Sequence, residues 1–234
     1  MTFPVTPAPA AEDAARHAPY DRVVAAAAEV LSAGGDEAVQ MKDLAQRAGV
    51  SLATLYRYFP SRDYVLLAVS LARYQEAARE IFAEPPQQGT VRDRVAGYLM
   101  REFRAQQQDQ RLVTALMPVL TETRRSYSAI IETIEHLHLQ IVRHVAAAGG
   151  SPSGQTLSEQ QEKLLRVVID IFGGATRHWL TGKFSAADVQ QQIEIGCQLL
   201  ELPDEVVAAE LARAAPDVRI RVTEHSEQAS ALLG

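Results

Sequence analysis

The sequence contains a single cysteine, Cys197, among 234 residues, so it offers no second cysteine for an intramolecular disulfide. Structural disulfides are rare in reducing compartments, which agrees with a cytoplasmic protein. The sequence also lacks an apolar run of the roughly 18 residues that a membrane-spanning helix requires. Its first residues have no basic stretch followed by an apolar one, as a secretory signal peptide would. We therefore expect a cytoplasmic protein that does not associate with a membrane.

Signatures of catalysis and metal binding are missing as well. The sequence has no Gly-rich phosphate loop, no G-x-S-x-G motif and no paired-carboxylate arrangement. His136, His138 and His144 lie on one expected helix, but no two of them are four residues apart. We therefore expect no metal site and no cofactor. The sequence contains no catalytic constellation that would support the alternative of an enzyme built on a helical bundle.

Positive charge is scarce overall, since the formal net charge is −6. Bulk charge of this sign repels the phosphates of a nucleic acid. The exception is segment 51–62, which holds Arg57 and Arg62 and no acidic residue, and Lys42 and Arg47 lie just before it. An acidic protein with one small basic end is expected to bind DNA only where several contacts converge, so nonspecific binding should be weak.

Apolar residues recur at helical spacing along most of the chain, and no alternating run is long enough to predict a sheet. The predicted fold class is therefore all-α. A short apolar helix that ends at Leu120 is expected to bend or break at Pro118, because proline removes a backbone donor. Helices outside the motif described next are expected at about residues 20–32, 61–82, 90–105, 112–120, 124–148, 158–181 and 185–202, with a weak last helix at 203–214. A polar joint is expected at 106–110, between two of them.

Residues 42–62 predict two short helices joined by a tight glycine turn. Gly49 can take the positive φ that a helix C-terminus favours, and Ser51 is a suitable N-cap for the second helix. Pro60 ends that helix, and Ser61 can cap the next one. A helix, a short turn and a second helix of roughly nine residues form the helix-turn-helix signature, whose second helix fits the DNA major groove. The apolar positions expected to pack inward are Leu44, Ala45, Ala48, Val50, Leu52 and Leu55.

This segment resembles the DNA-binding domain of TetR-family transcriptional regulators over roughly residues 18–82. Beyond it the family is too variable for motifs, and only the order of helices is comparable. The resemblance implies a three-helix helix-turn-helix DNA-binding domain at residues 19–84 and a C-terminal helical effector-binding and dimerisation domain at 90–215. The Pro and Ala content of the first residues predicts a disordered arm at 1–18, and a flexible tail is expected at 216–234. The matching positions are Leu44-Ala45, Ala48-Gly49-Val50-Ser51, Thr54-Leu55-Tyr56-Arg57-Tyr58-Phe59, Ser61-Arg62 and Leu66.

Two tyrosines of the second motif helix bear on DNA contact. Tyr56 and Tyr58 flank Arg57 and cannot both lie on the face of Leu55, so at least one must point outward, where its hydroxyl can reach a phosphate. Phe59, in contrast, is expected in the core. The residues expected to bind DNA are Lys42, Ser51, Ala53, Thr54, Tyr56, Arg57, Tyr58 and Arg62.

The resemblance assigns roles to several of these residues. It implies that Thr54 and Tyr58 touch DNA and that Arg62, where the family usually carries Lys, holds the DNA backbone. Lys42 matches a common phosphate contact. Ala53 replaces a frequent Gly, and its methyl group could reach a thymine methyl. Gln40 stands where the family prefers a capping Thr, so the first motif helix is expected to be less well capped.

The helix expected at residues 158–181 is apolar on several sides, whereas a surface helix needs only one apolar stripe. Gly173 and Gly174 would permit close approach of another helix. One interpretation is a tight helix–helix contact inside a single subunit. The resemblance implies the other, a homodimer in which the last two long helices pair across a two-fold axis, as an operator with paired half-sites requires.

Apolar and aromatic residues with a few polar ones come from four helices of the second domain and should surround one interior. Such a set describes a small-molecule pocket, and it describes equally well a core whose few polar groups are satisfied. The resemblance favours a pocket, and the many aliphatic side chains indicate an apolar effector. The candidate ligand-binding residues are Tyr98, Phe103, Met117, Tyr127, Ile131, Ile134, His138, Phe172 and Thr176.

The segment from Trp179 to Val189 is similar to the corresponding part of mycobacterial-type regulators of sterol and lipid breakdown. This likeness implies a fatty-acyl or sterol-like effector, or a coenzyme A ester. The sequence thus predicts a homodimeric, ligand-responsive transcriptional regulator, most often a repressor in the family, whose effector tilts the helix at residues 61–82. An architectural DNA-binding protein without an effector is the alternative, which a solid core would favour.

Overall fold

The computed structural model of the protein describes residues 11–35, 39–84, 88–121, 127–147 and 157–213. Regular structure within these ranges is entirely helical, which confirms the all-α prediction. In the same ranges, no helix combines the length and the apolar character needed to cross a lipid bilayer. The elements are α1 Ala11–Gly34, α2 Met41–Arg47, α3 Leu52–Tyr58, α4 Arg62–Ala83, α5 Val91–Gln108, α6 Gln110–Leu120, α7 Ser128–Ala147, α8 Glu159–Leu180, α9 Ala186–Gln198 and a 3₁₀ turn at Leu199–Glu201. Residues 204–213 are also helical, as predicted for the last helix.

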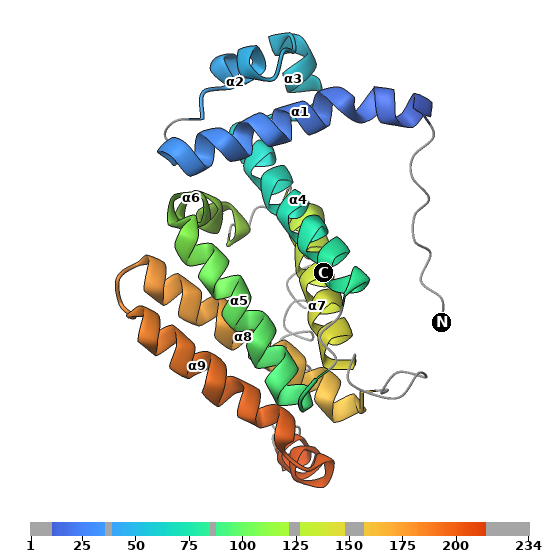
Figure 1. Ribbon diagram of the computed structural model, residues 1–234, viewed down its shortest axis with the longest axis vertical. Helices are drawn as coiled ribbons and strands as arrows, with labels where there is room; N and C mark the ends of the chain where they lie inside the picture. Colours follow the sequence, from blue (N-terminus) through green and yellow to red (C-terminus); the bar gives the residue numbers. More distant parts are fainter. Residues whose placement is uncertain (1–10, 36–38, 85–87, 122–126, 148–156, 214–234) are drawn as a thin grey trace, which may run out of the picture.

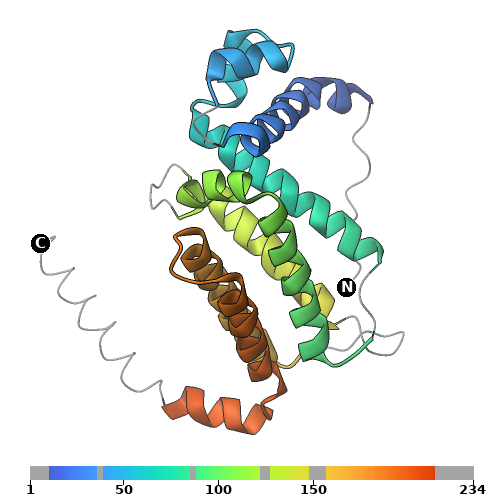
Figure 2. The same cartoon turned by 60° about the vertical axis from the view of Figure 1, so that its left-hand side comes forward.

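The helices form a small head and a larger body (Figure 1). α1, α2 and α3 make up the head, and α5, α7, α8 and α9 make up most of the body. α4 begins at the head and runs along the body beside α7, a relation that the rotated view repeats (Figure 2). α8 and α9 pack against each other. α4 is therefore the helix that connects the head to the body.

Three helices of the body begin with a capping box. Thr90, Ser158 and Ser185 each accept a hydrogen bond from a backbone N–H three residues later, and the side chain at that later position accepts one from the cap's own N–H. Because these bonds satisfy donors that a helix start leaves unpaired, they fix where α5, α8 and α9 begin. The predicted starts of these helices are confirmed.

The first helix is longer than predicted. α1 begins at Ala11 rather than near Tyr20, and it continues through Pro19. Alanine, the strongest helix former, occupies four of the eight positions 11–18, which explains the extension. Of the expected disordered arm, residues 1–10 lie outside the described residues, as do residues 214–234 of the expected tail.

The joint predicted between the fifth and sixth helices is shorter than expected. α5 continues to Gln108, and α6 begins at Gln110, so most of the polar segment is helical. α6 is also unbroken at Pro118, which lies in its last turn. The Thr121 hydroxyl donates to the Met117 carbonyl oxygen at 3.1 Å and stabilises this turn.

Buried apolar side chains form two cores that α4 connects. The first core contains residues of α1, α2, α3 and the N-terminal half of α4, together with residues of α6 and the start of α7. The second contains residues of α5, the C-terminal half of α7, α8 and α9, and Ala78 of α4. Tyr74 of α4 packs against both cores. α4 therefore contributes side chains to both cores.

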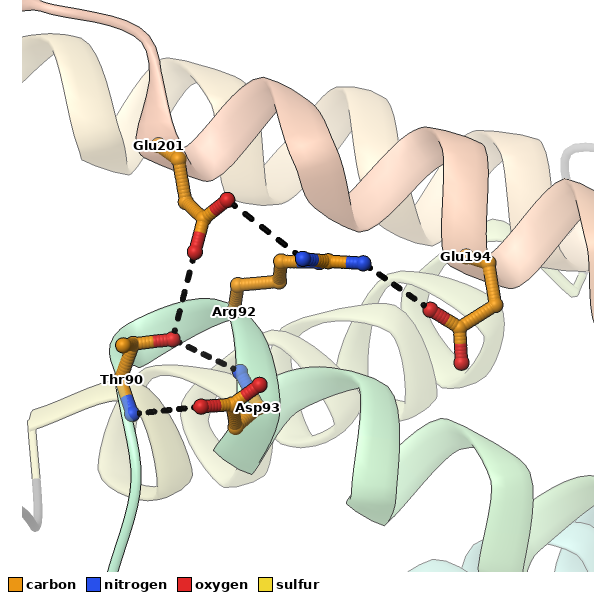
Figure 3. Close-up of polar contacts among 5 residues, drawn as sticks. All are labelled: Thr90, Arg92, Asp93, Glu194 and Glu201. Atoms are coloured by element: carbon orange, nitrogen blue, oxygen red, sulfur yellow. Dashed lines mark hydrogen bonds and ion pairs between the residues drawn. The ribbon is translucent and has the colours of Figure 1, made fainter.

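Two arginines near the start of α5 hold that helix against its neighbours. Arg92 pairs with Glu194 of α9 at 3.3 Å and with Glu201 at 3.6 Å (Figure 3). The Thr90 hydroxyl lies 3.5 Å from the same Glu201 carboxylate. Arg94 is buried and donates to two carbonyl oxygens in the last turn of α7, where positive charge is favourable. α5 is therefore fixed to both α7 and α9.

Candidate nucleic-acid interface and interior polar cluster

The turn between α2 and α3 has the predicted geometry. Gly49 adopts a positive φ of 63°. Arg22 of α1 donates from Nε to the Ala48 carbonyl oxygen at 3.0 Å, which secures the end of α2. Ser51 accepts a hydrogen bond from the Thr54 backbone N–H at 3.0 Å, so its predicted role as the N-cap of α3 is confirmed.

α3 has one face in the core and one face in solvent. Leu55 and Phe59 are buried on the inner face, as predicted. Leu52 is 41% exposed and Tyr56 is 47% exposed. The prediction that Leu52 belongs to the inner edge is wrong, because it lies one helical turn before Tyr56 on the outer face.

Tyr56 is the tyrosine that points outward, as the sequence predicted for at least one of the two. Tyr58 is half-buried, and its ring lies edge-on at 6.2 Å from Tyr20 of α1. Tyr20 in turn stacks on Phe59 at 5.0 Å. The Arg57 guanidinium lies 5.1 Å from the centre of the Tyr58 ring, which orients this cation on the outer side of α3.

The two residues that precede α2 and α4 provide little capping. Gln40 makes no side-chain cap hydrogen bond, as expected. Ser61 stands at the N-cap position of α4, but its buried hydroxyl has no hydrogen-bond partner in the described part of the chain. The expectation that Ser61 caps α4 is therefore wrong.

The residues predicted to bind DNA all lie on α2, on α3 with its N-cap, or at the first position of α4, at the head of the molecule. The exposed ones are Lys42, Ser51, Ala53, Tyr56 and Arg57, and the half-buried ones are Thr54, Tyr58 and Arg62.

A group of polar side chains lies in the body between the two cores, on α4, α5 and α7. The Tyr74 hydroxyl donates to Glu102 Oε1 at 3.4 Å, and the Gln106 amide nitrogen donates to the same oxygen at 3.4 Å. His138 Nε2 lies 3.2 Å from Glu102 Oε2. The rings of Tyr74 and Tyr98 lie 5.1 and 6.3 Å from the His138 ring. We call these five residues the interior polar cluster.

The cluster controls the protonation of its own members. Burial alone would raise the pKa of the Glu102 carboxyl, but His138 and the hydroxyls of Tyr98 and Tyr74 outweigh it and hold that pKa below its ordinary value. Burial and the Glu102 charge raise the pKa of Tyr74 and of Tyr98. Glu102 is therefore an ionised acceptor at neutral pH, and the two tyrosines are neutral donors.

Two buried polar atoms of the body, Gln106 Oε1 in the cluster and Thr176 Oγ1 on α8, form no hydrogen bond with any described residue. Thr176 is 1% exposed. Glu102 Oε2 and His138 Nε2 pair with each other at 3.2 Å. Phe172, one turn before Thr176 on α8, has its ring 6.4 Å from His138. Since buried polar groups normally have partners, Gln106 and Thr176 retain unused hydrogen-bonding capacity.

The predicted ligand-binding residues fall into two groups, of which the first meets at this cluster. Tyr98 and His138 belong to it, and Phe172 contacts the His138 ring. Thr176 follows Phe172 by one turn of α8. Phe103 lies next to Glu102 in the chain and is fully buried against Trp179, at 5.2 Å between ring centres.

The second group lies in the core that is shared with the head. Ile131, Ile134 and Tyr127 pack in this first core, and Met117 is half-buried on α6. The Tyr127 hydroxyl donates to Asp63 Oδ2 at 2.8 Å, in the first turn of α4. Tyr127 therefore joins the start of α7 to the start of α4, apart from the cluster.

Sequence reasoning missed three members of the cluster: Tyr74, Glu102 and Gln106. A signal for two of them was present. Glu102 and Gln106 follow Tyr98 at intervals of four residues, so they lie on the apolar face of α5 that also buries Leu99 and Phe103. A carboxylate on such a face is unusual and indicates a paired or functional group.

A groove of about 420 Å³ lies on the outer surface of α5 and α9, and no predicted ligand-binding residue lines it. Its acidic groups already have partners, since Asp93 belongs to the α5 capping box and Glu194 pairs with Arg92 (Figure 3). The described residues also contain no group of three or more His, Cys, Asp and Glu side chains that could hold a metal ion.

Comparison with known proteins finds a matching family for both the N-terminal and the C-terminal part of the chain. Residues 23–69 match the family described as "Bacterial regulatory proteins, tetR family", and residues 89–200 match "Tetracyclin repressor-like, C-terminal domain". The chain is 32% identical over 179 residues to the HTH-type transcriptional repressor KstR of Rhodococcus jostii (strain RHA1), a match that covers 76% of this chain and 81% of that relative.

Solved structures share the fold. A TetR transcriptional regulator from Rhodococcus sp. RHA1 is 25% identical and superposes with a TM-score of 0.69, over 80% of this chain and 97% of that one. The transcriptional regulator FadR of Bacillus subtilis, in complex with stearoyl-CoA, is 18% identical and superposes with a TM-score of 0.53, over 77% and 97% of the two chains.

Proposed function

Because this chain belongs to the TetR family of bacterial regulatory proteins, it is a DNA-binding transcriptional regulator that responds to a ligand, and we propose that it is a repressor that a small apolar effector releases from its operator. The observation that carries the proposal is the outer face of α3, where exposed Tyr56 and Arg57 are held by a buried inner face. The similarity to a relative named as a transcriptional repressor supports repression rather than activation of transcription. A regulator of this kind is expected in the cytoplasm, with the DNA.

We assign α3 to the major groove and its neighbours to the DNA backbone. In this proposal Ala53, Thr54 and Tyr58 face base edges or the adjacent sugar-phosphate, because they lie on α3. Lys42 and Arg62 hold phosphates on either side of α3, which fixes orientation without reading sequence. Ser51, Tyr56 and Arg57 complete the contact surface and can also reach phosphates.

TetR-family regulators act as dimers, and we propose that this one pairs through α8 and α9. Val167 of α8 is 43% exposed and Ile195 of α9 is 50% exposed in a single chain, which supports a covering partner. A methyl group added at Gly173 or Gly174 would meet no described atom within 4 Å, so the subunit itself makes no close helix approach there. Two-fold pairing would place two α3 helices in successive major grooves, about 34–36 Å apart.

We propose that the effector binds in the body, among residues predicted from the sequence. Tyr98 and His138 belong to the interior polar cluster, to which α4, the link to the head, contributes Tyr74. Phe172 contacts the His138 ring, Phe103 follows Glu102 in the chain, and Thr176 lies one turn after Phe172 on α8. A fatty-acyl or sterol-like molecule, or its coenzyme A ester, fits the apolar walls. The fold shared with a regulator that holds stearoyl-CoA is consistent with such a ligand.

The remaining candidate residues have a different role in this proposal. Met117, Ile131, Ile134 and Tyr127 lie on α6 and at the start of α7, between the effector site and the head. In this proposal α6 and the start of α7 have two alternative positions. An effector that binds the protein more tightly in one position than in the other would shift the equilibrium toward that position and tilt α4.

Fluorescence anisotropy tests the proposal directly. Labelled DNA from the gene's own upstream region would be compared with shuffled DNA at two salt concentrations, with and without stearoyl-CoA as a first effector probe. Tight binding to the native fragment and release by an apolar ligand would support a ligand-controlled repressor. Equal affinity with and without every ligand that binds would leave an architectural DNA-binding protein as the better description, and mass spectrometry of the purified protein would reveal an effector already bound.

A further inference from the structure

Three aromatic rings of the head contact one another where α3 meets α1. The Tyr20 ring of α1 stacks on Phe59 at 5.0 Å, with 25° between their planes, and meets Tyr58 edge-on at 6.2 Å. The Tyr58 and Phe59 rings lie 6.4 Å apart. Distances in this range are typical of favourable aromatic pairs. Each ring therefore contacts the other two, and we call Tyr20, Tyr58 and Phe59 the aromatic triad.

The aromatic triad extends to a cation on the outer face of α3. The guanidinium carbon of Arg57 lies 5.1 Å from the centre of the Tyr58 ring, which is the distance of a cation–π contact. Arg57 is exposed, Tyr58 is half-buried and Phe59 is buried, so three consecutive residues lead from the solvent into the core. The direction in which Arg57 points therefore depends on the position of the Tyr58 ring.

α3 depends on its neighbours for its position. The helix contains only seven residues, Leu52–Tyr58, of which Leu55 is buried. Helices of this length are not stable alone, so tertiary contacts determine where they lie. After Tyr58 the backbone turns to the extended conformation of Phe59, with φ −129° and ψ 91°. The contacts of the aromatic triad therefore help to fix the end of α3 that carries Arg57 and Tyr58.

Tyr20 lies in the interior of a long helix. α1 begins at Ala11, so the Tyr20 ring projects from an internal turn and not from a helix end, where fraying is common. Two residues later on α1, Arg22 donates from Nε to the Ala48 carbonyl oxygen at 3.0 Å, at the end of α2. α1 therefore holds the helix-turn-helix at two points, which are the turn before α3 and the end of α3.

An arginine that is oriented before binding loses less conformational freedom when it meets DNA. Its side chain has several rotatable bonds, and ordering them at an interface weakens binding. Recognition of a DNA sequence requires contacts at fixed positions, whereas nonspecific attraction requires only positive charge near phosphates. Loosening Arg57 and Tyr58 should therefore weaken sequence-specific binding more than nonspecific binding.

From these contacts we infer that Tyr20 of α1, which is not among the predicted DNA-binding residues, is a positioning residue that determines the sequence specificity of DNA binding. Its ring fixes the Tyr58 ring, and the Tyr58 ring orients Arg57. This inference rests on the proposed function, because it requires the outer face of α3 to contact DNA. The role belongs to the ring of Tyr20 and not to its hydroxyl. Burial and the charge of Asp21 raise the pKa of that hydroxyl, so it is neutral at neutral pH.

The test compares two substitutions of Tyr20 with a matched control on the same helix. Tyr20→Phe keeps the ring, whereas Tyr20→Leu keeps an apolar side chain without a ring. Val30→Ala is the control, because Val30 is also a half-buried residue of α1 that packs against the first core. Operator DNA is selected from a random library with the wild-type protein. Fluorescence anisotropy then compares this DNA with shuffled DNA at two salt concentrations, for each intact variant.

We expect Tyr20→Leu to lower the preference for operator over shuffled DNA about fivefold, which corresponds to the loss of one aromatic pair. Its affinity for shuffled DNA should stay within about twofold of the wild-type value, with an unchanged salt slope, because no charge is removed. Tyr20→Phe and Val30→Ala should keep the wild-type preference. A smaller folded fraction would weaken binding to both DNAs alike, so the ratio of the two affinities separates positioning from stability.

Nuclear magnetic resonance reads the arrangement of the rings without DNA. The side-chain resonances of Arg57 are assigned from their absence in Arg57→Lys. In the wild-type protein and in Tyr20→Phe they should show the ring-current shift of Tyr58, because the guanidinium lies over that ring. In Tyr20→Leu they should move toward ordinary arginine values.

Several outcomes would overturn the inference. An unchanged operator preference in folded Tyr20→Leu would remove the role of Tyr20 in specificity, and unchanged Arg57 resonances would remove its role in positioning. A loss in Tyr20→Phe as large as in Tyr20→Leu would assign the hydroxyl to a direct contact. An equal loss in Val30→Ala would show a general effect of packing in the head.

The proposed function is judged separately, by the selection of operator DNA with the wild-type protein. If no sequence is enriched, the regulator and the role of Tyr20 are both refuted. A selected operator that Tyr20→Leu binds with the wild-type preference rejects the role of Tyr20 and keeps the regulator.

Discussion

Thr176 is buried in the body, yet its hydroxyl has no partner among the described residues. Valine has the same shape and lacks the polar atom that folding must desolvate. We therefore expect Thr176→Val to leave the free energy of unfolding unchanged or to raise it by about 1 kcal/mol. Urea denaturation of the purified protein measures this.

Thr90→Val is the natural comparison, because the Thr90 hydroxyl caps α5. That variant should lose about 1 kcal/mol of the free energy of unfolding. A loss of the same size in Thr176→Val would mean that the Thr176 hydroxyl is already hydrogen-bonded, which would contradict its lack of a partner among the described residues.

Glu102 links stability to pH. Its pKa in the folded protein is lower than the ordinary value of 4.5, so its ionised form stabilises the fold above about pH 4.5, and this contribution is lost as the pH falls. Between about pH 6 and about pH 4, the wild-type protein should lose more free energy of unfolding than Glu102→Gln, which cannot titrate there. Denaturant titrations at both pH values give the comparison, and equal losses would contradict the assigned ionisation.

Arg62 at the first position of α4 is assigned to a phosphate, which carries no base information. Arg62→Ala should weaken binding to all DNA sequences alike and reduce the slope of log affinity against log salt by about one. Anisotropy titrations at several salt concentrations measure both effects. Arg79→Ala, near the far end of α4, should change neither, and a loss of discrimination at one base pair with an unchanged salt slope would reassign Arg62.

At the scale of elements, the start of α7 is tied to the start of α4. The Tyr127 hydroxyl donates to Asp63 at 2.8 Å, and its ring lies edge-on at 5.2 Å from Tyr64. Tyr127→Phe keeps the ring contacts and removes a bond of about 1–2 kcal/mol. We expect little change in the DNA affinity of the effector-free protein and a several-fold higher effector concentration for half-release.

Asp63→Asn is the control for this prediction, because its side-chain oxygen still accepts from Tyr127. It should release DNA at nearly the wild-type effector concentration. Release by Tyr127→Phe at the unchanged concentration would show that the α4–α7 contact does not carry the response.

The elements that could be predicted from the sequence are those with local causes. α8 and α9 start where Ser158 and Ser185 cap them, and the α2–α3 turn follows from Gly49, each within a few residues. The predicted start of α1 near residue 20 is too late, because the alanine-rich residues 11–18 extend the helix through Pro19. Leu52 was misplaced because one turn of α3 offers two faces, and only packing decides between them.

The candidate sites differ for the same reason. The DNA-binding face lies mainly on two short consecutive helices, so its residues are close together in the sequence as well as in space. The interior polar cluster is assembled from α4, α5 and α7, and Tyr74 meets Glu102 across 28 residues. Such a meeting depends on how the helices pack, which periodicity does not determine.

At the scale of the whole molecule, the exposed apolar residues of α8 and α9 predict a dimer. Ile195→Glu places a charge in the proposed interface and should raise the dimer dissociation constant by about two orders of magnitude or more. Light scattering coupled to size exclusion would then report a monomer, with weaker binding to an operator of paired half-sites. Ile195→Val should remain a dimer, and a dimeric Ile195→Glu would move the interface elsewhere.

The shared use of α4 by two cores has a consequence for how such a protein can be recombined. A hybrid joined after the end of α4 at Ala83 would keep the head but lose Leu112, Leu116 and Val119 of α6, which pack in the head's own core. Such a hybrid would have an exposed apolar surface under its recognition helices. New pairings of operator and effector are therefore reached more readily by substitutions on α3 and around Glu102 than by exchanging whole halves of the chain.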